Sequence, residues 1–193
     1  MSLALVPAAG KAERFGSVKL LVDLDGEPLI ARTIRSLLDA GVAHVVVIVA
    51  PGSPLLDPGI LPAGAPVVTT VVNPDPARGM FSSIQAGCAV AEGEPLLVLP
   101  ADMPFVRPAT IAAVLAAAAD GDAVVLPTFR GKHGHPIGLP GSACDAILAA
   151  DPRSNLKAVL AATGPPHVEL DVDDPGVLRD VDVPSDLKDP RRL

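Results

Sequence analysis

The chain has 193 residues, of which 49% are hydrophobic, and this is enough for a substantial buried core. Its formal net charge is −7 and it lacks Trp and Tyr, which argues against a nucleic-acid surface built on phosphate attraction and base stacking. No apolar run approaches the roughly 20 residues that span a bilayer, and no signal peptide is recognisable, so we expect no membrane partner and a cytoplasmic location.

Apolar runs predict buried strands that alternate with helices. In chain order we expect a strand at 3–8, a helix at 28–40, a strand at 44–50, an irregular connection at 51–66, a strand at 65–72, a helix at 80–91, a strand at 95–100, a helix at 108–119 and a strand at 122–127. Continuous rather than alternating apolar strands are typical of a mainly parallel sheet with helices on both faces. The sequence therefore predicts an α/β fold, a three-layer α/β/α sandwich of Rossmann-like type, with residues 1–193 forming one domain.

Ligands of such folds bind beyond the carboxyl ends of the strands. We therefore expect the loops after residues 8, 72, 100 and 127 to meet around one crevice. The two cysteines, Cys88 and Cys144, form no CxxC or Cys/His cluster, so we expect both to be small core residues rather than a disulfide framework or a zinc site.

The first loop, "PAAGKAERFGSVKLL", interrupts the apolar pattern directly after the first strand. Gly10 and Gly16 allow close approach of a ligand, while Lys11, Arg14 and Lys19 supply positive charge. Such a loop can hold phosphates. Its spacing is neither GxGxxG nor GxxxxGK[ST], which counts against a dinucleotide site and a P-loop ATPase, and an ordinary solvated turn is the alternative.

Acidic residues mark two later segments. Asp102 in "LPADMP" follows an apolar strand, where a carboxylate can hold Mg²⁺ against a triphosphate; alternatively it caps the helix that begins near Pro108. In "RDVDVPSDL", Asp180 and Asp182 alternate along an extended segment, so that one of them can reach the same metal, unless the segment is a solvated acidic surface.

A further acidic segment, "ELDVDDPG", lies just upstream. Its carboxylates, Asp171, Asp173 and Asp174, are better candidates for such a solvated surface.

Five segments in order resemble the MobA-like nucleotidyltransferase family, and within it the molybdenum cofactor cytidylyltransferases: "PAAGKAERFGSVKLL", "NPDPARGMFSSIQAG", "LPADMPFV", "GKHGHPIGL" and "RDVDVPSDL". The resemblance covers nearly the whole chain. Nucleotidyltransferases share the first form, AAGxxxRxGxxK, widely, whereas GMxSSI together with ADMPxV and GHP is more selective. The resemblance implies a nucleotide-diphospho-sugar transferase type of sandwich.

The resemblance implies transfer of a nucleotidyl group from a nucleoside triphosphate to the terminal phosphate of a pterin cofactor, with release of pyrophosphate and with Mg²⁺ as cofactor. Lys19 and Arg14 would neutralise the triphosphate, and Asp102 and Asp182 would bind the metal. The acceptor phosphate is already ionised, so no general base is required and catalysis depends on positioning and charge. The product would pass to a molybdenum hydroxylase as a further partner.

The resemblance also implies residues that bind the two substrates. Cytidylyl members usually read AAG in the first loop where guanylyl members read AGG, so Ala8, Ala9 and Gly10 favour CTP. The implied nucleotide-binding set is Ala8, Ala9, Gly10, Arg14, Lys19, Asn73 and Gly79. Ser82 and Ser83, near the start of a helix that can bind an anion, and His135 in "GHP" would contact the acceptor.

Three other functions compete with this one. The first is a nucleotidyltransferase that uses another nucleoside triphosphate or another phosphorylated acceptor, such as a sugar phosphate. The second is an accessory protein that binds the finished cofactor without catalysis, although such a carrier would not need Lys19, Asp102 and Asp182 together. The third, an NAD-dependent oxidoreductase, is disfavoured by the glycine spacing.

Overall fold

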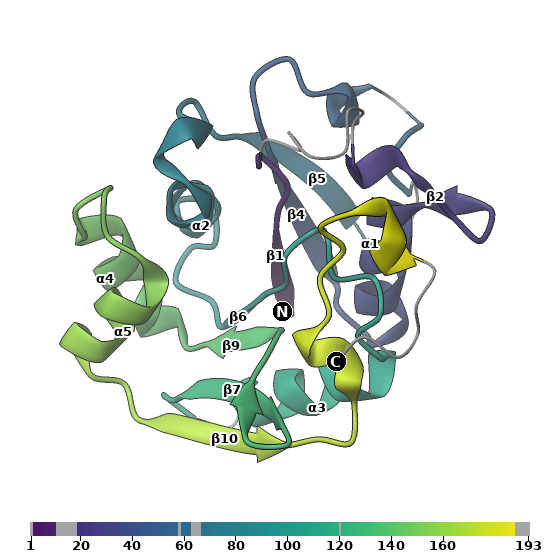
Figure 1. Ribbon diagram of the computed structural model, residues 1–193. Helices are drawn as coiled ribbons and strands as arrows, with labels where there is room; N and C mark the ends of the chain where they lie inside the picture. Colours follow the sequence, from purple (N-terminus) through teal and green to yellow (C-terminus); the bar gives the residue numbers. More distant parts are fainter. Residues whose placement is uncertain (1, 11–18, 58, 63–66, 120, 188–193) are drawn as a thin grey trace.

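The computed structural model describes residues 2–10, 19–57, 59–62, 67–119 and 121–187 (Figure 1). Its strands include β1 Leu3–Pro7, β4 His44–Val49, β5 Val67–Val72, β6 Leu96–Val98, β7 Val124–Phe129, β8 Lys132–His133, β9 Ile137–Leu139 and β10 His167–Asp171. The helices are α1 Leu29–Asp39, α2 Met80–Cys88, α3 Pro108–Ala119, α4 Gly141–Ala149 and α5 Leu156–Thr163. Most of these elements coincide with the predicted ones to within one to three residues at each end.

The strands form one mixed, mostly parallel sheet in the order β10-β7-β9-β6-β1-β4-β5, with β8 paired to β7. β1 lies at the centre, parallel to both β4 and β6, and all five of its residues are buried. β5 continues the parallel arrangement beyond β4. The carboxyl ends of β1 and β6 therefore lie next to each other, as the sequence pattern predicts.

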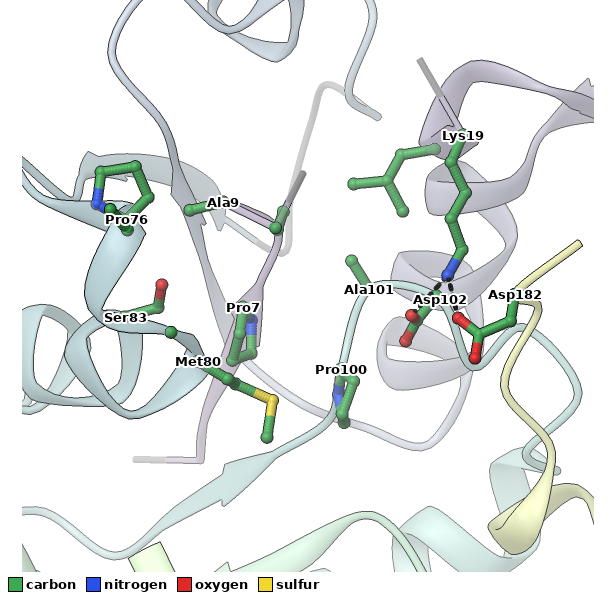
Figure 2. A pocket seen from close by; sticks show the side chains of 15 residues that line it. Pro7, Ala9, Lys19, Pro76, Met80, Ser83, Pro100, Ala101, Asp102 and Asp182 are labelled. Atoms are coloured by element: carbon green, nitrogen blue, oxygen red, sulfur yellow. Dashed lines mark hydrogen bonds and ion pairs between the residues drawn. The ribbon is translucent and has the colours of Figure 1, made fainter. Parts of the chain in front are cut away.

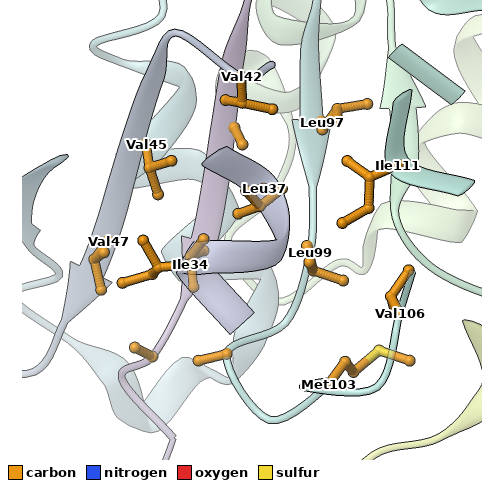
Figure 3. Close-up of a cluster of buried hydrophobic side chains, with 14 of the residues drawn as sticks. Ile34, Leu37, Val42, Val45, Val47, Leu97, Leu99, Met103, Val106 and Ile111 are labelled. Atoms are coloured by element: carbon orange, nitrogen blue, oxygen red, sulfur yellow. The ribbon is translucent and has the colours of Figure 1, made fainter. Parts of the chain in front are cut away.

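Helices cover both faces of the sheet, which confirms the three-layer architecture (Figure 1). Strand side chains that point to one face of the sheet, including Val6 and Val45, pack with α1 and α3 in one core cluster. The other set, including Leu5 and Val46, packs with α2, α4 and α5 in a second cluster. Alternation along each strand therefore divides the core into two halves, and Figure 3 shows Ile34 of α1 in the first half.

β9, which the sequence patterns did not predict, separates two of the predicted strands in the sheet. β9 is antiparallel to β6 and β7 and lies between them, so that β7 is not the neighbour of β6. The chain after Pro127 continues along β7 to Phe129 and turns into β8, and it contributes nothing to the crevice described below. The expectation that the loop after residue 127 borders the crevice is therefore wrong. An antiparallel insertion of only three residues gives too little periodicity to be recognised in sequence.

The structure also contains elements that the sequence patterns did not predict, most of them in the second half of the chain. These are β8, β9, α4, α5 and β10, together with the small β2–β3 hairpin, Asp23–Leu24 and Glu27–Pro28, before α1. The predicted irregular connection at 51–66 contains a short 3-10 helix, Pro54–Leu56, capped by Ser53; residues 58 and 63–66 lie outside the described part.

Asp174 corrects the interpretation of the acidic segment "ELDVDDPG". Rather than facing solvent, Asp174 is 2% exposed. Its carboxylate accepts hydrogen bonds from the backbone N–H of Arg107 at 2.9 Å, the hydroxyl of Thr110 at 2.7 Å and the backbone N–H of Gly176 at 2.9 Å. A buried carboxylate is tolerated because these donors replace water. Asp174 thus supplies the cap at the start of α3 that Asp102 could have provided.

Two further contacts describe how α2 is held. Cys88 at its end and Cys144 of α4 are both buried free thiols, and the Cys144 thiol donates to Cys88 Sγ at 3.0 Å. Gly87 lies so close to β1 that an added Cβ would come within 2.6 Å of Leu5 Cδ1. The absence of a side chain at residue 87 therefore allows α2 to pack directly on the central strand.

Among the described residues, the longest helix is α3 with 12 residues, and none is long and apolar enough to cross a membrane.

Candidate active site

A cavity of about 480 Å³ opens at the carboxyl ends of β1 and β6 (Figure 2). Its described lining residues are Pro7, Ala8, Ala9, Gly10, Lys19, Leu20, Pro76, Ala77, Gly79, Met80, Ser83, Pro100, Ala101, Asp102 and Asp182. Three of the four predicted loops contribute to this lining, together with the C-terminal segment. Figure 2 shows Lys19, Asp102 and Asp182 on one side and Pro76, Met80 and Ser83 on the other, with the end of β1 between them.

The charged side consists of three residues that are far apart in sequence. Lys19 Nζ lies 2.8 Å from Asp102 Oδ2 and 3.0 Å from Asp182 Oδ1. The Lys19 side chain is only 12% exposed, whereas Asp102 and Asp182 are 28% and 56% exposed. One ammonium group therefore connects both carboxylates at the cavity wall.

Backbone hydrogen bonds explain why these carboxylates converge. The N–H of Ala101 donates to the carbonyl of Pro7 at 3.2 Å, which extends the β1–β6 pairing to the residue before Asp102. The N–H of Val181 donates to the Asp102 carbonyl at 2.9 Å, and this places Asp182 beside Asp102. The C-terminal segment is therefore attached to the site through its main chain.

Thr33 of α1 is a further member of this arrangement that sequence reasoning missed. It is fully buried, and its hydroxyl donates to the carbonyl of Ala101 at 3.0 Å. The same hydroxyl lies 3.4 Å from the Leu29 carbonyl within α1. A threonine in an amphipathic helix gives no sequence signal for a contact 68 residues away.

Two ionisation equilibria are perturbed at the charged side. Burial lowers the pKa of the Lys19 amine, but its hydrogen bonds and ion pairs with Asp102 and Asp182 outweigh this effect, so the pKa is raised overall and the ammonium is the stable form. Burial, and then the negative charge of Asp182, raise the pKa of Asp180. Asp180 is not among the lining residues, so Asp182 is the member of this pair that faces the cavity.

The first loop forms the floor of the cavity. The N–H of Ala8 donates to the Ile48 carbonyl at 2.8 Å, which fixes the chain where β1 ends, and Ala9 is 5% exposed. A Cβ built on Gly10 would meet nothing within 4 Å among the described residues, so this backbone is accessible to a ligand. Pro7 completes β1 without donating a hydrogen bond, and its carbonyl accepts from Ala101 as described above.

The residues predicted on the opposite side divide into two groups. Asn73 and Ser82 are buried and do not line the cavity; Asn73 Nδ2 donates to the hydroxyls of Ser82 at 2.8 Å and Ser83 at 3.0 Å. Gly79 and Ser83 do line it. Gly79 has φ +89°, a left-handed conformation that favours glycine, and it leads the chain into α2 beside Met80.

His135 also lies behind the cavity wall rather than in it. Its Nδ1 is 3.4 Å from the Val98 carbonyl near the end of β6, and its backbone N–H donates to Val177 at 2.9 Å. Burial lowers the pKa of His135, so the imidazole is neutral at neutral pH. Direct contact of His135, Asn73 or Ser82 with a substrate stays a prediction, and Arg14, with Lys11 and Gly16, lies outside the described residues.

A sequence profile of the MobA-like NTP transferase domain matches residues 4–168. The chain belongs to the MobA-like NTP transferase family. It is 24% identical over 187 residues to the molybdenum cofactor cytidylyltransferase of Escherichia coli strain K12, with 95% of this chain and 92% of the relative covered. The resemblance inferred from the motifs is therefore confirmed at the level of the family.

Two other relatives of this MobA-like protein broaden the comparison. It is 32% identical over 168 residues to the 2-C-methyl-D-erythritol 4-phosphate cytidylyltransferase of Rhodococcus opacus strain B4, with 84% of this chain and 70% of the relative covered. A solved nucleotidyl transferase from Methanothermobacter superimposes with a TM-score of 0.80 at 26% identity, covering 96% of this chain and 94% of its own. Nucleotidyl transfer is thus common to relatives whose named acceptors differ.

Two carboxylates at the charged side of this MobA-like protein, Asp102 and Asp182, could hold a divalent cation. Mg²⁺ prefers oxygen ligands and is often held by one or two carboxylates together with substrate phosphates. Asp102 and Asp182 both lie within hydrogen-bonding distance of one nitrogen atom, so their oxygens converge on a common point. Within the described ranges no group of three or more His, Cys, Asp or Glu side chains is gathered, so a metal here would take its remaining ligands from water or substrate.

Proposed function

We propose that this MobA-like protein transfers CMP from CTP to the terminal phosphate of molybdopterin, releasing pyrophosphate. One observation carries the proposal: Lys19, Asp102 and Asp182 meet at 2.8 and 3.0 Å beside the open backbone of Ala8–Gly10. This arrangement offers a cation for phosphate, carboxylates for a divalent metal and a backbone surface for a nucleoside. An accessory carrier would need none of these together.

In the reaction, an oxygen of the acceptor phosphate forms a bond to the α-phosphorus of CTP, and the bond from that phosphorus to the bridging oxygen of pyrophosphate breaks. The acceptor oxygen is already ionised, so no proton has to be removed before it attacks. Lys19 stabilises the negative charge that pyrophosphate carries away. The chain therefore acts by positioning and by charge, and no general base is assigned.

Asp102 and Asp182 are the residues proposed to hold Mg²⁺. When bound, Mg²⁺ supplies neutralisation of the triphosphate charge and polarisation of the phosphoryl group. Arg14, by its match to the family motif, is proposed to assist Lys19 on the triphosphate. The backbone of Ala8, Ala9 and Gly10 is proposed to contact the base and ribose, with Ala9 narrowing the base site against a purine.

The opposite side of the cavity is proposed to receive the acceptor. Ser83 and the backbone at Gly79 face the cavity near the start of α2, where N–H groups that lack helical partners can bind a phosphate. Met80 is 49% exposed at this side and, with Pro76 and Ala77, provides an apolar surface that suits a flat heterocycle. Asn73 and Ser82 are buried behind this side and are proposed to hold its loop in place.

The relative in Rhodococcus opacus favours a second acceptor, 2-C-methyl-D-erythritol 4-phosphate, because its identity of 32% exceeds that of the molybdenum cofactor enzyme. Two observations favour the pterin. The molybdenum cofactor enzyme aligns along 92% of its length against 70% for the other relative, and the exposed apolar surface around Met80 offers little to a hydrated polyol.

Two measurements test the proposal. Thermal shifts with CTP, GTP, ATP and UTP in the presence of Mg²⁺ should show strong stabilisation by CTP alone, about 2.7 kcal/mol at 100 times its Kd. Pyrophosphate should then be released from CTP when molybdopterin is added, but not when 2-C-methyl-D-erythritol 4-phosphate is added. Release with the polyol phosphate alone would move the assignment to the second acceptor, and no release with either would leave binding without catalysis.

A single substitution tests the proposed preference for CTP over GTP. Ala9→Gly removes the proposed obstacle to a purine, and GTP should then stabilise the protein or support turnover. If Ala9→Gly remains selective for CTP, the steric explanation is wrong, whereas the acceptor assignment is unaffected.

A further inference from the structure

The position of the Lys19 ammonium has a consequence for metal binding. Nζ donates to Asp102 Oδ2 and Asp182 Oδ1, so the ammonium already engages both carboxylates that would hold a divalent cation (Figure 2). Mg²⁺ binds oxygen at roughly 2.0–2.1 Å, closer than an ammonium group hydrogen-bonds. Two cations that compete for the same two carboxylates repel each other, so both cannot occupy this position.

We propose that Lys19 and a divalent cation exchange at Asp102 and Asp182. Lys19 holds the two carboxylates together as an internal cation, and an arriving metal ion displaces its ammonium, which then turns to the triphosphate. This inference rests on the metal role in the proposed function and adds a step to it. Lys19 therefore competes with the metal for the carboxylates, whereas at the nucleotide both cations neutralise the triphosphate.

The surroundings allow such a movement. The ammonium is carried by a flexible chain of four methylenes, and Lys19 itself borders the cavity into which it would turn. Asp182 is 56% exposed, so a hydrated ion can reach it without opening the core. The ion pair of Lys19 with the exposed Asp182 is therefore weak, so the competition lowers metal affinity without abolishing it.

The exchange predicts that metal and nucleotide reinforce each other's binding. A metal at the carboxylates releases Lys19 for the phosphates, and phosphates that engage Lys19 release the carboxylates for the metal. Because such coupling is reciprocal, each ligand strengthens the other by the same factor. Metal alone is expected to bind weakly.

Binding of Mn²⁺ to the protein without nucleotide tests the exchange. Lys19→Met removes the ammonium while keeping an extended apolar side chain, and it should tighten Mn²⁺ binding by about tenfold in a calorimetric or electron paramagnetic resonance titration. Lys132→Met is the matched control, because it makes the same change of charge at an exposed residue of β8, and its Mn²⁺ affinity should equal that of the unaltered protein. Equal or weaker Mn²⁺ binding by Lys19→Met would overturn the proposal.

A second measurement uses the unaltered protein and so does not depend on how the variant folds. Trace acetylation with acetic anhydride, read by mass spectrometry, should modify Lys19 several times faster when Mn²⁺ is present, because the displaced amine loses its carboxylate partners. Lys132 and the exposed Lys157 provide internal references whose rates should not change. An unchanged or slower rate at Lys19 contradicts the displacement.

These readouts separate the inference from the function on which it rests. Tight Mn²⁺ binding by Lys19→Met and faster acetylation of Lys19, without pyrophosphate release from CTP, would support the exchange and reject the assigned substrates. Turnover of CTP with no effect of Lys19 on Mn²⁺ binding would support the function and reject the exchange.

Discussion

The two sides of the cavity use polar residues in opposite ways. On the charged side, Asp102 and Asp182 both contact Lys19 while part of each carboxylate side chain stays exposed. On the α2 side, Asn73 and Ser82 are buried, and their side chains form hydrogen bonds with each other and with the main chain. The comparison teaches that a selective motif contains both residues that meet the substrate and residues that hold the loop in place.

Substitutions on the charged side should lower activity strongly and change the free energy of unfolding little. Asp102→Asn removes one carboxylate from the proposed metal site and should lower turnover by on the order of 10² to 10³. Its effect on unfolding by urea should be small, because the side chain is partly exposed and keeps its shape. Steady-state kinetics and urea unfolding of the same preparation check both halves of this prediction.

Asp145→Asn is the matched control for Asp102→Asn, because it makes the same chemical change at an exposed residue of α4. It should leave turnover unaltered. A turnover of Asp102→Asn close to that of Asp145→Asn would remove Asp102 from the reaction.

The α2 side should show the reverse behaviour. Asn73→Ala deletes two buried hydrogen bonds that Nδ2 donates to Ser82 and Ser83 and a partly buried one that Oδ1 accepts from the Asp75 N–H. The groups left without partners should lower the free energy of unfolding by about 2–3 kcal/mol. Urea unfolding measures this loss directly.

Asn155→Ala offers a control of the same residue type. Asn155 caps α5 at an exposed position, where its side chain accepts from the Ala158 N–H at 2.9 Å, and its loss should cost about 1 kcal/mol. If Asn73→Ala is no more destabilised than Asn155→Ala but loses affinity for nucleotide, Asn73 touches the ligand and the comparison between the two sides fails.

Thr33 tests whether the charged side also depends on buried support. Thr33→Val keeps the shape of the side chain but removes the hydroxyl that donates to the Ala101 carbonyl. We expect a loss of about 1–2 kcal/mol in unfolding free energy and a severalfold lower kcat, because Asp102 follows the released carbonyl. Thr33→Ser retains the donor and should restore kcat; a fall in stability without any change in kcat would make Thr33 merely structural.

The sequence predicted the parts of this molecule that follow from strong local patterns. Buried strands such as β1 and β4 are continuous apolar runs, and α1 has a clear apolar face, so the layers and the crevice at the carboxyl ends of β1 and β6 follow from periodicity and topology. Lys19 and Asp102 were predicted from their positions after buried strands, and the resemblance to the family selected Asp182 over Asp180. That these three side chains meet at one point is visible only in the structure, because it depends on the hydrogen bond from the Val181 N–H to the Asp102 carbonyl.

The elements that were missed share a physical cause. β9 has three residues and α5 has eight, so neither offers enough periodicity, and the antiparallel direction of β9 is fixed only by its neighbours. Asp174 and Thr33 act through contacts across more than 60 residues, which no spacing rule reveals. Asp174 was expected to be solvated but is buried and caps α3, and Thr33 is buried in α1, where its hydroxyl holds the Ala101 carbonyl next to Asp102.

His135 provides the smallest expected effect and extends the comparison to the polar residue behind β6. Burial holds its pKa below the ordinary value near 6.5, so the unfolded chain binds a proton more readily than the folded protein as the pH falls. Stability should therefore decrease below about pH 6.5, and His135→Gln should lose less stability than the unaltered protein between about pH 7 and about pH 5.5 in urea unfolding. His167→Gln, at the exposed start of β10, is the control and should retain the acid sensitivity of the unaltered protein. If His135→Gln retains it as well, burial of His135 is not the source of the acid sensitivity, and His135 does not belong with the buried supports.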